Sequence, residues 1–189
     1  MIRIPRVLLG VLFLIPLAIG CAGSGGDHSK RQEVASQEAG RMVAPSQRLS
    51  SYANFELLPA TLSPSIEENE DKIAYAEKLE GLLAARLETR FAEWSSSGMG
   101  RGTLQIQPEF ETIKIVSGGA RFWAGAMAGS STIDISLALI DAASGEVIAR
   151  PRVTRSSNAM AGGWSVGATD QNLLYYIVDI ADQYLVANY

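Results

Sequence analysis

The clearest hydrophobic pattern in the chain lies between residues 65 and 94, where apolar residues recur every four positions. The repeating positions are Tyr75, Leu79, Leu83, Leu87 and Phe91, with Leu82 and Trp94 on the flank. Ser65 and Glu68 form a capping-box pattern, which is typical of a helix start. The segment therefore predicts an amphipathic helix that ends where Ser and Gly break the period at residues 95–98. We expect this helix to cover a sheet, and a partner-binding helix is the alternative.

Alternating apolar and polar residues predict strands after this helix. Between Leu104 and Phe110 the apolar residues occupy even positions, whereas Ile113 and Ile115 occupy odd ones. Because side chains alternate between the two faces of a strand, this change of parity predicts a bulge or a break near residues 110–112.

A hairpin is predicted between residues 132 and 155. Alternation from Thr132 to Ile140 is followed by the turn sequence 141–146, with Gly145 at the position that favours positive φ. The returning strand would place Val147, Ala149, Pro151 and Val153 on the inner face. Pro151 cannot donate a ladder hydrogen bond, so this strand should lie at a sheet edge or contain a bulge.

A short first strand is expected over residues 52–58, before Pro59. A last helix should follow Thr169 as its N-cap and reach the end of the chain. Its apolar stripe is Leu173, Tyr176, Ile177, Ile180, Ala181 and Tyr184. The order strand, helix, strands, helix predicts an α+β fold, in which two helices pack on a mainly antiparallel sheet of four to five strands.

The first 21 residues have the pattern of a secretory signal. Arg3 and Arg6 precede an apolar stretch of 13 residues, Val7 to Ile19, which is too short to span a bilayer of about 30 Å. The following Gly20-Cys21 resembles a bacterial lipobox. This resemblance implies cleavage before Cys21, acylation of its sulfur and usually of the new amine, and a membrane anchor of fatty acyl chains.

The predicted organisation has three parts: a signal peptide (1–20), a lipidated N-terminus with a flexible spacer (21–50), and a single domain (51–189). The spacer prediction rests on Gly, Ser and Gln without apolar periodicity. Residue 22 is Ala rather than Asp. For a proteobacterial lipoprotein, this implies sorting to the outer membrane, on the inner leaflet facing the periplasm.

Charge and cysteine content exclude several classes of function. Removal of Arg3 and Arg6 leaves 14 basic against 20 acidic residues, a net charge of −6 once the amine is acylated. We expect no nucleic-acid binding, because such binding requires basic surface. With Cys21, the only cysteine, acylated, no cysteine remains for a disulfide or a thiolate metal site.

No motif for catalysis, a metal or a cofactor is recognisable. The only histidine, His28, lies in the predicted spacer, away from any candidate nucleophile. The carboxylate pairs Glu109/Glu111 and Asp179/Asp182 are expected on a strand surface and a helix flank. We therefore expect no catalytic residues, no metal and no cofactor, with an undetected hydrolase as the alternative.

Two segments rich in small residues flank the predicted hairpin, at 117–130 and 158–164, and both contain Ala-Met-Ala-Gly. If the strands pair, both segments must leave the same end of the sheet. The candidate interaction residues there are Arg121, Trp123, Gly125, Met127, Gly129, Met160 and Trp164. Aromatic residues commonly anchor interfaces, whereas the alternative is that the glycines serve turns and the tryptophans the core.

Residues 119–149 are similar to the core of a family of bacterial lipoproteins of unknown function. That core combines a Gly-Arg-aromatic turn, an alternating strand and an Asp-x-x-Ser/Thr-Gly hairpin. The matching positions are Gly119, Arg121, Gly125, Gly129, Asp141 and Gly145. The resemblance implies a small α/β domain like those of the Tol-system periplasmic protein and curli-secretion lipoproteins, with no enzymatic activity.

The expected function is that of a non-catalytic envelope lipoprotein. Its domain would bind another envelope protein or associate with itself, while the lipid on Cys21 holds it to the membrane. A carrier or sensor that binds a small ligand or glycan between helix and sheet is the alternative.

Overall fold

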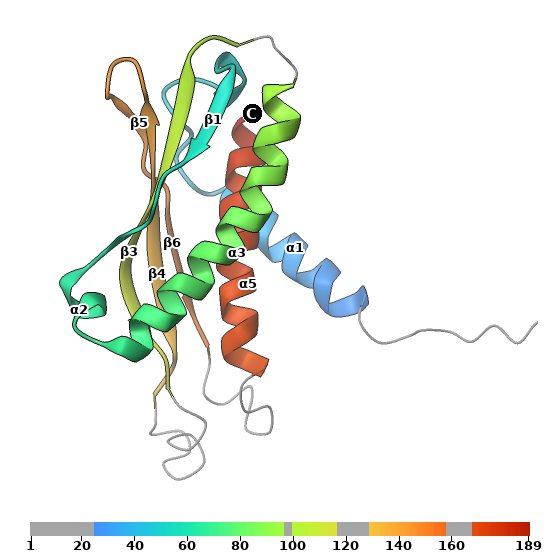
Figure 1. Cartoon of the computed structure of the whole chain (residues 1–189). Coiled ribbons are helices and arrows are strands. Elements are labelled where there is room, and N and C mark those ends of the chain that lie inside the picture. The colour runs from blue at the N-terminus through green and yellow to red at the C-terminus, as the bar shows by residue number, and fades with distance from the viewer. Residues whose placement is uncertain (1–24, 97–99, 117–128, 158–167) are drawn as a thin grey trace, which may run out of the picture.

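The computed structural model describes residues 25–96, 100–116, 129–157 and 168–189. One twisted sheet forms one layer, and the two longest helices pack against one of its faces (Figure 1). The helices are α1 (Gly25–Ala39), η1 (Leu49–Ser51), α2 (Pro64–Glu67), α3 (Glu70–Ser95) and α5 (Ala168–Asn188). The strands are β1 (Asn54–Leu57), β2 (Thr61–Leu62), β3 (Thr103–Lys114), β4 (Thr132–Asp141), β5 (Val147–Ala149) and β6 (Arg152–Ser156). The predicted α+β class is confirmed.

The sheet contains six described strands in four strand positions. Strands β3 and β4 pair antiparallel at its centre. The short strands β1 and β2 both pair in parallel with β3, and β5 and β6 both pair antiparallel with β4. Each outer position of the sheet therefore holds one strand that is interrupted into two short ones. This explains why the sequence predicted four to five strands where the structure has six described ones.

A proline lies at each interruption. Pro59 lies between β1 and β2, and Pro151 lies between β5 and β6. Although Pro151 has no N–H to donate, its carbonyl accepts a hydrogen bond from the Leu137 amide at 3.0 Å. The predicted edge or bulge position of Pro151 is confirmed for the described part of the sheet.

The register of the sheet confirms one predicted irregularity and reveals another. The β3–β4 register shifts between Phe110 and Thr112, as the change of parity predicts. A second shift follows Leu139, so Ile148 faces the core at 6% exposure while Val147 is 42% exposed. The prediction that Val147 faces inward was wrong, because the hairpin turn introduces an irregularity that the alternation does not show.

The predicted helix over residues 65–94 is two helices. Helix α2 ends at Glu67, and the Asn69 side chain caps α3 by accepting a hydrogen bond from the Lys72 amide at 3.1 Å. The capping-box prediction for Ser65 was therefore wrong, since Asn69 provides the cap for the long helix. The predicted apolar face is confirmed by burial of Leu79, Leu83, Leu87, Phe91 and Trp94.

The segment predicted as a spacer also differs in the structure. From Gly25 it forms α1, which packs along α5 and buries Ala35 and Ala39. Two alanines are a weak hydrophobic signal, so periodicity alone does not reveal this helix. Leu49 and Tyr52 are also buried, and the folded domain begins at α1 rather than near residue 51.

Helix α5 is the centre of the helical layer. It contacts α1 and α3 as well as strands β4 and β6. Its buried apolar residues are Leu173, Leu174, Ile177, Val178, Ile180, Ala181, Tyr184 and Leu185. Within the described ranges, no helix is both long enough and apolar enough to cross a membrane.

Candidate interaction surface

Three chain segments meet at one end of the sheet. Lys114 at the end of β3 pairs with Thr132 at the start of β4, and Thr132 pairs with Ser156 at the end of β6. The two segments rich in small residues therefore start next to each other, as the predicted hairpin requires. We call this end of the domain, marked by Val116, Ser131 and Ser157, the Gly-rich end; it lies at the foot of the sheet in Figure 1.

The Gly-rich end has a buried, hydrogen-bonded base. The Ser157 amide donates to the Ser131 carbonyl at 2.8 Å, and the Ser131 amide donates to Ser157 Oγ at 3.2 Å. The Ser131 hydroxyl oxygen also accepts a hydrogen bond from the Val116 amide at 2.9 Å. Both serines are buried, so these bonds satisfy polar groups where the strands end.

Of the predicted interaction residues, Gly129 belongs to the described chain and has φ of +80°. A residue with a side chain rarely adopts this conformation, so glycine is suited to the position. Arg121, Trp123, Gly125, Met127, Met160 and Trp164 lie outside the described residues, as does Cys21. Their predicted roles stay predictions.

A surface hollow of about 380 Å³ lies beside the Gly-rich end. Its lining comes from the start of α3 and the end of β3: Asn69, Asp71, Lys72, Tyr75, Lys114 and Ile115. The Lys72 ammonium donates to the Ser65 carbonyl at 2.8 Å, so this lysine is oriented by the α2 segment. The hollow combines two lysine ammonium groups and the Asp71 carboxylate with a partly buried tyrosine.

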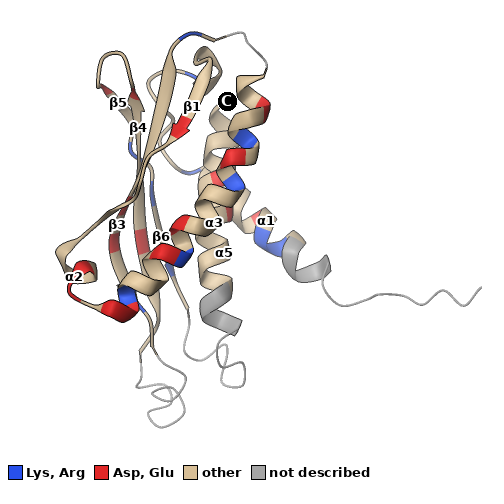
Figure 2. Ribbon diagram, viewed as in Figure 1, with Lys and Arg blue, Asp and Glu red and all other residues tan. Residues whose placement is uncertain are grey.

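The sheet face opposite the helices carries charged residues of both signs, visible on β3, β4 and β6 in Figure 2. Arg150 forms an ion pair with Glu109, and Arg152 forms one with Asp134. The hydrogen bond from Arg152 lowers the pKa of Asp134 below its usual value, although burial acts in the opposite direction. Arg150 and Arg152 therefore lie on the same outer face of the sheet as Asp134 and Ser136.

The two carboxylate pairs singled out in the sequence have cationic or hydroxyl partners. Ser136 Oγ donates to Glu109 at 2.9 Å and to Glu111 at 3.4 Å on the outer sheet face. Asp179 and Asp182 are each 1% exposed, which corrects their expected position on an exposed helix flank.

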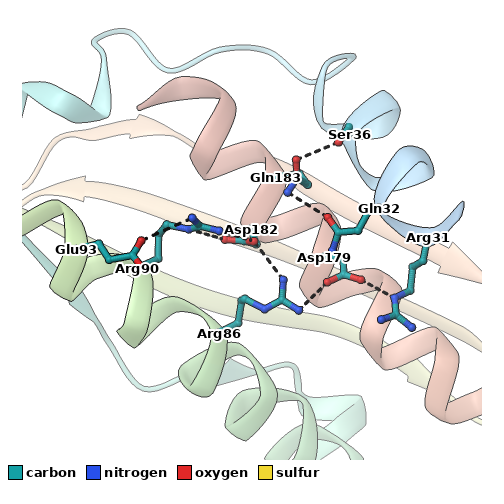
Figure 3. A network of polar contacts seen from close by, with 9 residues as sticks. All are labelled: Arg31, Gln32, Ser36, Arg86, Arg90, Glu93, Asp179, Asp182 and Gln183. Atoms are coloured by element: carbon teal, nitrogen blue, oxygen red, sulfur yellow. Dashed lines mark hydrogen bonds and ion pairs between the residues drawn. The ribbon is translucent and has the colours of Figure 1, made fainter. Parts of the chain in front are cut away.

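Both buried aspartates face arginines from neighbouring helices (Figure 3). Asp182 accepts from Arg90 at 3.1 and 3.2 Å and from Arg86 at 3.2 Å. Asp179 pairs with Arg86 at 2.9 Å and with Arg31 at 2.5 Å. A buried carboxylate is costly unless it is paired, so this cluster fixes α1 and α3 against α5.

This cluster was not predicted from the sequence. The available signal was the placement of Asp179 and Asp182 beside the apolar stripe of α5, with Arg86 and Arg90 one turn apart on α3. That spacing cannot show which helices pack together. Among the described residues, no group of three or more His, Cys, Asp or Glu side chains could hold a metal ion.

No protein-family model and no curated protein matches the chain. Among solved structures, two PelC dodecamers from Paraburkholderia phytofirmans, one of them a leucine-to-methionine variant, are similar at 12% identity and TM-scores of 0.43. The matches cover 77% and 76% of this chain, and 95% and 94% of those chains. A candidate lipoprotein from Caulobacter crescentus matches at 12% identity and a TM-score of 0.35, covering 81% of this chain and 89% of that one.

Proposed function

We propose that the chain is a non-catalytic, lipid-anchored protein of the bacterial envelope. In this proposal its domain binds another envelope protein or a second copy of itself through the Gly-rich end. The observation that carries the proposal is the pair of reciprocal hydrogen bonds between Ser131 and Ser157. These bonds hold the two small-residue segments next to each other at the point where they leave the strands. The lipobox at Cys21 supports the anchored part.

The chemistry of the Gly-rich end suits contact with another chain. Small residues allow a partner backbone to approach closely, and tryptophans contribute much of the binding energy where they are buried at an interface. Trp123 and Trp164 belong to the two segments whose bases meet. The residues at this base are already held in place by hydrogen bonds. Fewer residues therefore have to become ordered when a partner binds, and the entropic cost of binding is lower.

Photo-crosslinking in intact cells tests this surface. The double variant Trp123→Ala/Trp164→Ala should lose most crosslinking to its partner while its melting temperature stays close to that of the parent. Val147→Ala is the matched control, because Val147 is exposed on β5, a separate strand of the domain. Unchanged crosslinking in the double variant would remove the Gly-rich end from the account.

The anchored part of the proposal has its own test. Intact-mass analysis of the chain from purified envelopes should show a mature protein that starts at an acylated Cys21. An unmodified thiol, or an uncleaved leader, would contradict it. This measurement is independent of any partner.

A second candidate function is a carrier or sensor for a small ligand or glycan. The hollow beside Tyr75 and Lys114 favours it, since its volume of about 380 Å³ falls within the roughly 300–1,000 Å³ of small-molecule sites. Native mass spectrometry of the chain from envelopes should then show a bound molecule that Tyr75→Ala releases. Retention of the same mass in that variant would contradict a ligand in this hollow.

A further inference from the structure

We infer that α1 is a docked strap that holds the helical side of the domain against a lipid bilayer. The inference deepens the proposed function, because it rests on attachment of lipid at Cys21. In this inference, the surface around α1 and the exposed part of α5 lies against the bilayer that carries the lipid anchor.

Polar contacts fix α1 along α5. Arg31 pairs with the buried Asp179 at 2.5 Å, and Ser36 Oγ donates to Gln183 at 3.0 Å. Near the other end of the helix, Glu38 forms an ion pair with Arg155 of β6. Since Asp179 is 1% exposed, release of Arg31 would leave a buried carboxylate with less compensation, which favours the docked state.

Aromatic rings add to this docking. The Arg31 guanidinium lies over the Tyr175 ring of α5 at 5.3 Å, and Arg155, the ion-pair partner of Glu38, is itself held over the Tyr176 ring of α5 at 4.8 Å. Cation–π pairs at such distances stabilise by about 0.5–1 kcal/mol each at exposed sites. The strap is therefore held at two points along its length as well as by the buried Ala35 and Ala39.

The chain between the anchor and the strap is short. Helix α1 starts at Gly25, four residues after Cys21, and four residues span at most about 14 Å when fully extended. A flexible spacer of about 30 residues would instead have a root-mean-square extension of roughly 30 Å. Docking of α1 thus converts a long tether into a short one.

The position of α1 sets which side of the domain faces the lipid. Helix α1 lies on the helical side, and the sheet's opposite face points the other way (Figure 1). Lys30 is exposed near the start of the strap, and Tyr175 beneath Arg31 is 39% exposed. Tyrosine and lysine are favoured at the lipid–water interface, so this side suits the bilayer and leaves the outer sheet face in water.

Oxidative footprinting on vesicles tests the orientation. The mature chain from Cys21 is coupled through its lone thiol to a maleimide lipid in phosphatidylcholine vesicles, so anchoring does not depend on acylation by the cell. Two tyrosines report: Tyr175 on the helical side, and one introduced by Gln107→Tyr on the outer face of β3. Coupling should reduce Tyr175 oxidation to about a third and leave the other reporter unchanged.

Two controls separate the strap from simple proximity to lipid. A Gly/Ser insertion of about 20 residues after Ala22 should restore Tyr175 oxidation, because it lengthens the tether without touching α1. Arg31→Ala/Glu38→Ala should also restore it, and should remove hydrogen-exchange protection from residues 31–39 in solution. Loss of that protection while the amides of α3 and α5 stay protected would show that the strap alone is released.

An equal reduction of oxidation at Tyr175 and at the tyrosine introduced by Gln107→Tyr, or no reduction at Tyr175, would overturn the inference. So would an α1 whose amides exchange freely in the parent chain. An unmodified Cys21 in native envelopes would contradict the proposed function instead, because the vesicle experiment uses chemical coupling. The two failures are therefore distinguishable.

Discussion

Trp94 stacks on Tyr189, with ring centroids 4.2 Å apart and an angle of 7° between the ring planes. The contact joins the end of α3 to the last residue of the chain. Phe55 of β1 packs against both rings, at 5.1 Å from Trp94 and 6.1 Å from Tyr189. This aromatic cluster closes the core at the C-terminal ends of α3 and α5.

Tyr189→Ala should lower the free energy of unfolding by about 1–2 kcal/mol, because an aromatic pair contributes about 0.5–1.5 kcal/mol beyond the area that it buries. Tyr189→Phe keeps the ring and should stay within about 0.5 kcal/mol of the parent. Urea denaturation measures both variants. Equal losses in the two variants would show that the hydroxyl, and not stacking, is responsible.

Asp182→Ala should destabilise the protein by about 2–3 kcal/mol, because Arg86 and Arg90 lose a buried carboxylate partner while their own side chains remain partly exposed. The matched control is Glu93→Gln on the same arginine cluster. The Glu93 side chain is 64% exposed, so its pair with Arg90 should contribute less than about 1 kcal/mol. Thermal unfolding of the two variants measures the difference. Similar decreases of the melting temperature in Asp182→Ala and Glu93→Gln would contradict the larger contribution of the buried carboxylate.

Gly100→Ala should be strongly destabilising. A Cβ at this position would lie 2.2 Å from the backbone carbonyl of Tyr52, where the chain segments of residues 51–53 and 100–102 cross. The control is Gly81→Ala in α3, where a Cβ meets nothing within 4 Å. That change should stabilise the helix by up to about 1 kcal/mol, so calorimetry should show shifts of opposite sign. Shifts of the same sign would contradict the close crossing at Gly100.

Stability should fall at high pH through Tyr52. Burial, with a further contribution from the Asp141 carboxylate, raises the pKa of Tyr52 from 10.0 to about 12. Because the folded-state pKa is the higher one, this contribution is complete below pH 10 and is lost as the pH rises toward 12. Unfolding measured between pH 9 and 12 should show a steeper loss in the parent than in Tyr52→Phe. The same pH dependence of unfolding in the parent and in Tyr52→Phe would contradict the role given to the raised pKa of Tyr52.

The sequence predicted the elements that bury continuous apolar faces. The stripe of α3, the bulge near Phe110 and the hairpin turn at Gly145 all follow from periodicity or turn chemistry. Gly145 has φ of +75°, and its amide donates to the Asp141 carbonyl at 2.8 Å, as the turn sequence predicts. Local patterns are sufficient for features of this kind because their causes lie within a few residues.

The features that were missed depend on contacts between distant segments. Helix α1 is held by Arg31 and Asp179, which are separated by 148 residues. The parallel pairing of β1 with β3 requires α3 to cross over between them, and no pattern in either strand specifies it. For the Gly-rich end, the shared base was predictable from the hairpin, whereas the Ser131–Ser157 hydrogen bonds were not.

Site-specific photo-crosslinking from Ser130 tests the central claim most directly. Ser130 is a half-exposed, described residue directly beside the Ser131–Ser157 base, and a probe at Thr154 on the outer sheet face is the comparison. The account predicts a discrete adduct in intact cells from position 130 that is lost in Trp123→Ala/Trp164→Ala and is not formed from position 154. No adduct from position 130, or the same adduct from both positions, would contradict it.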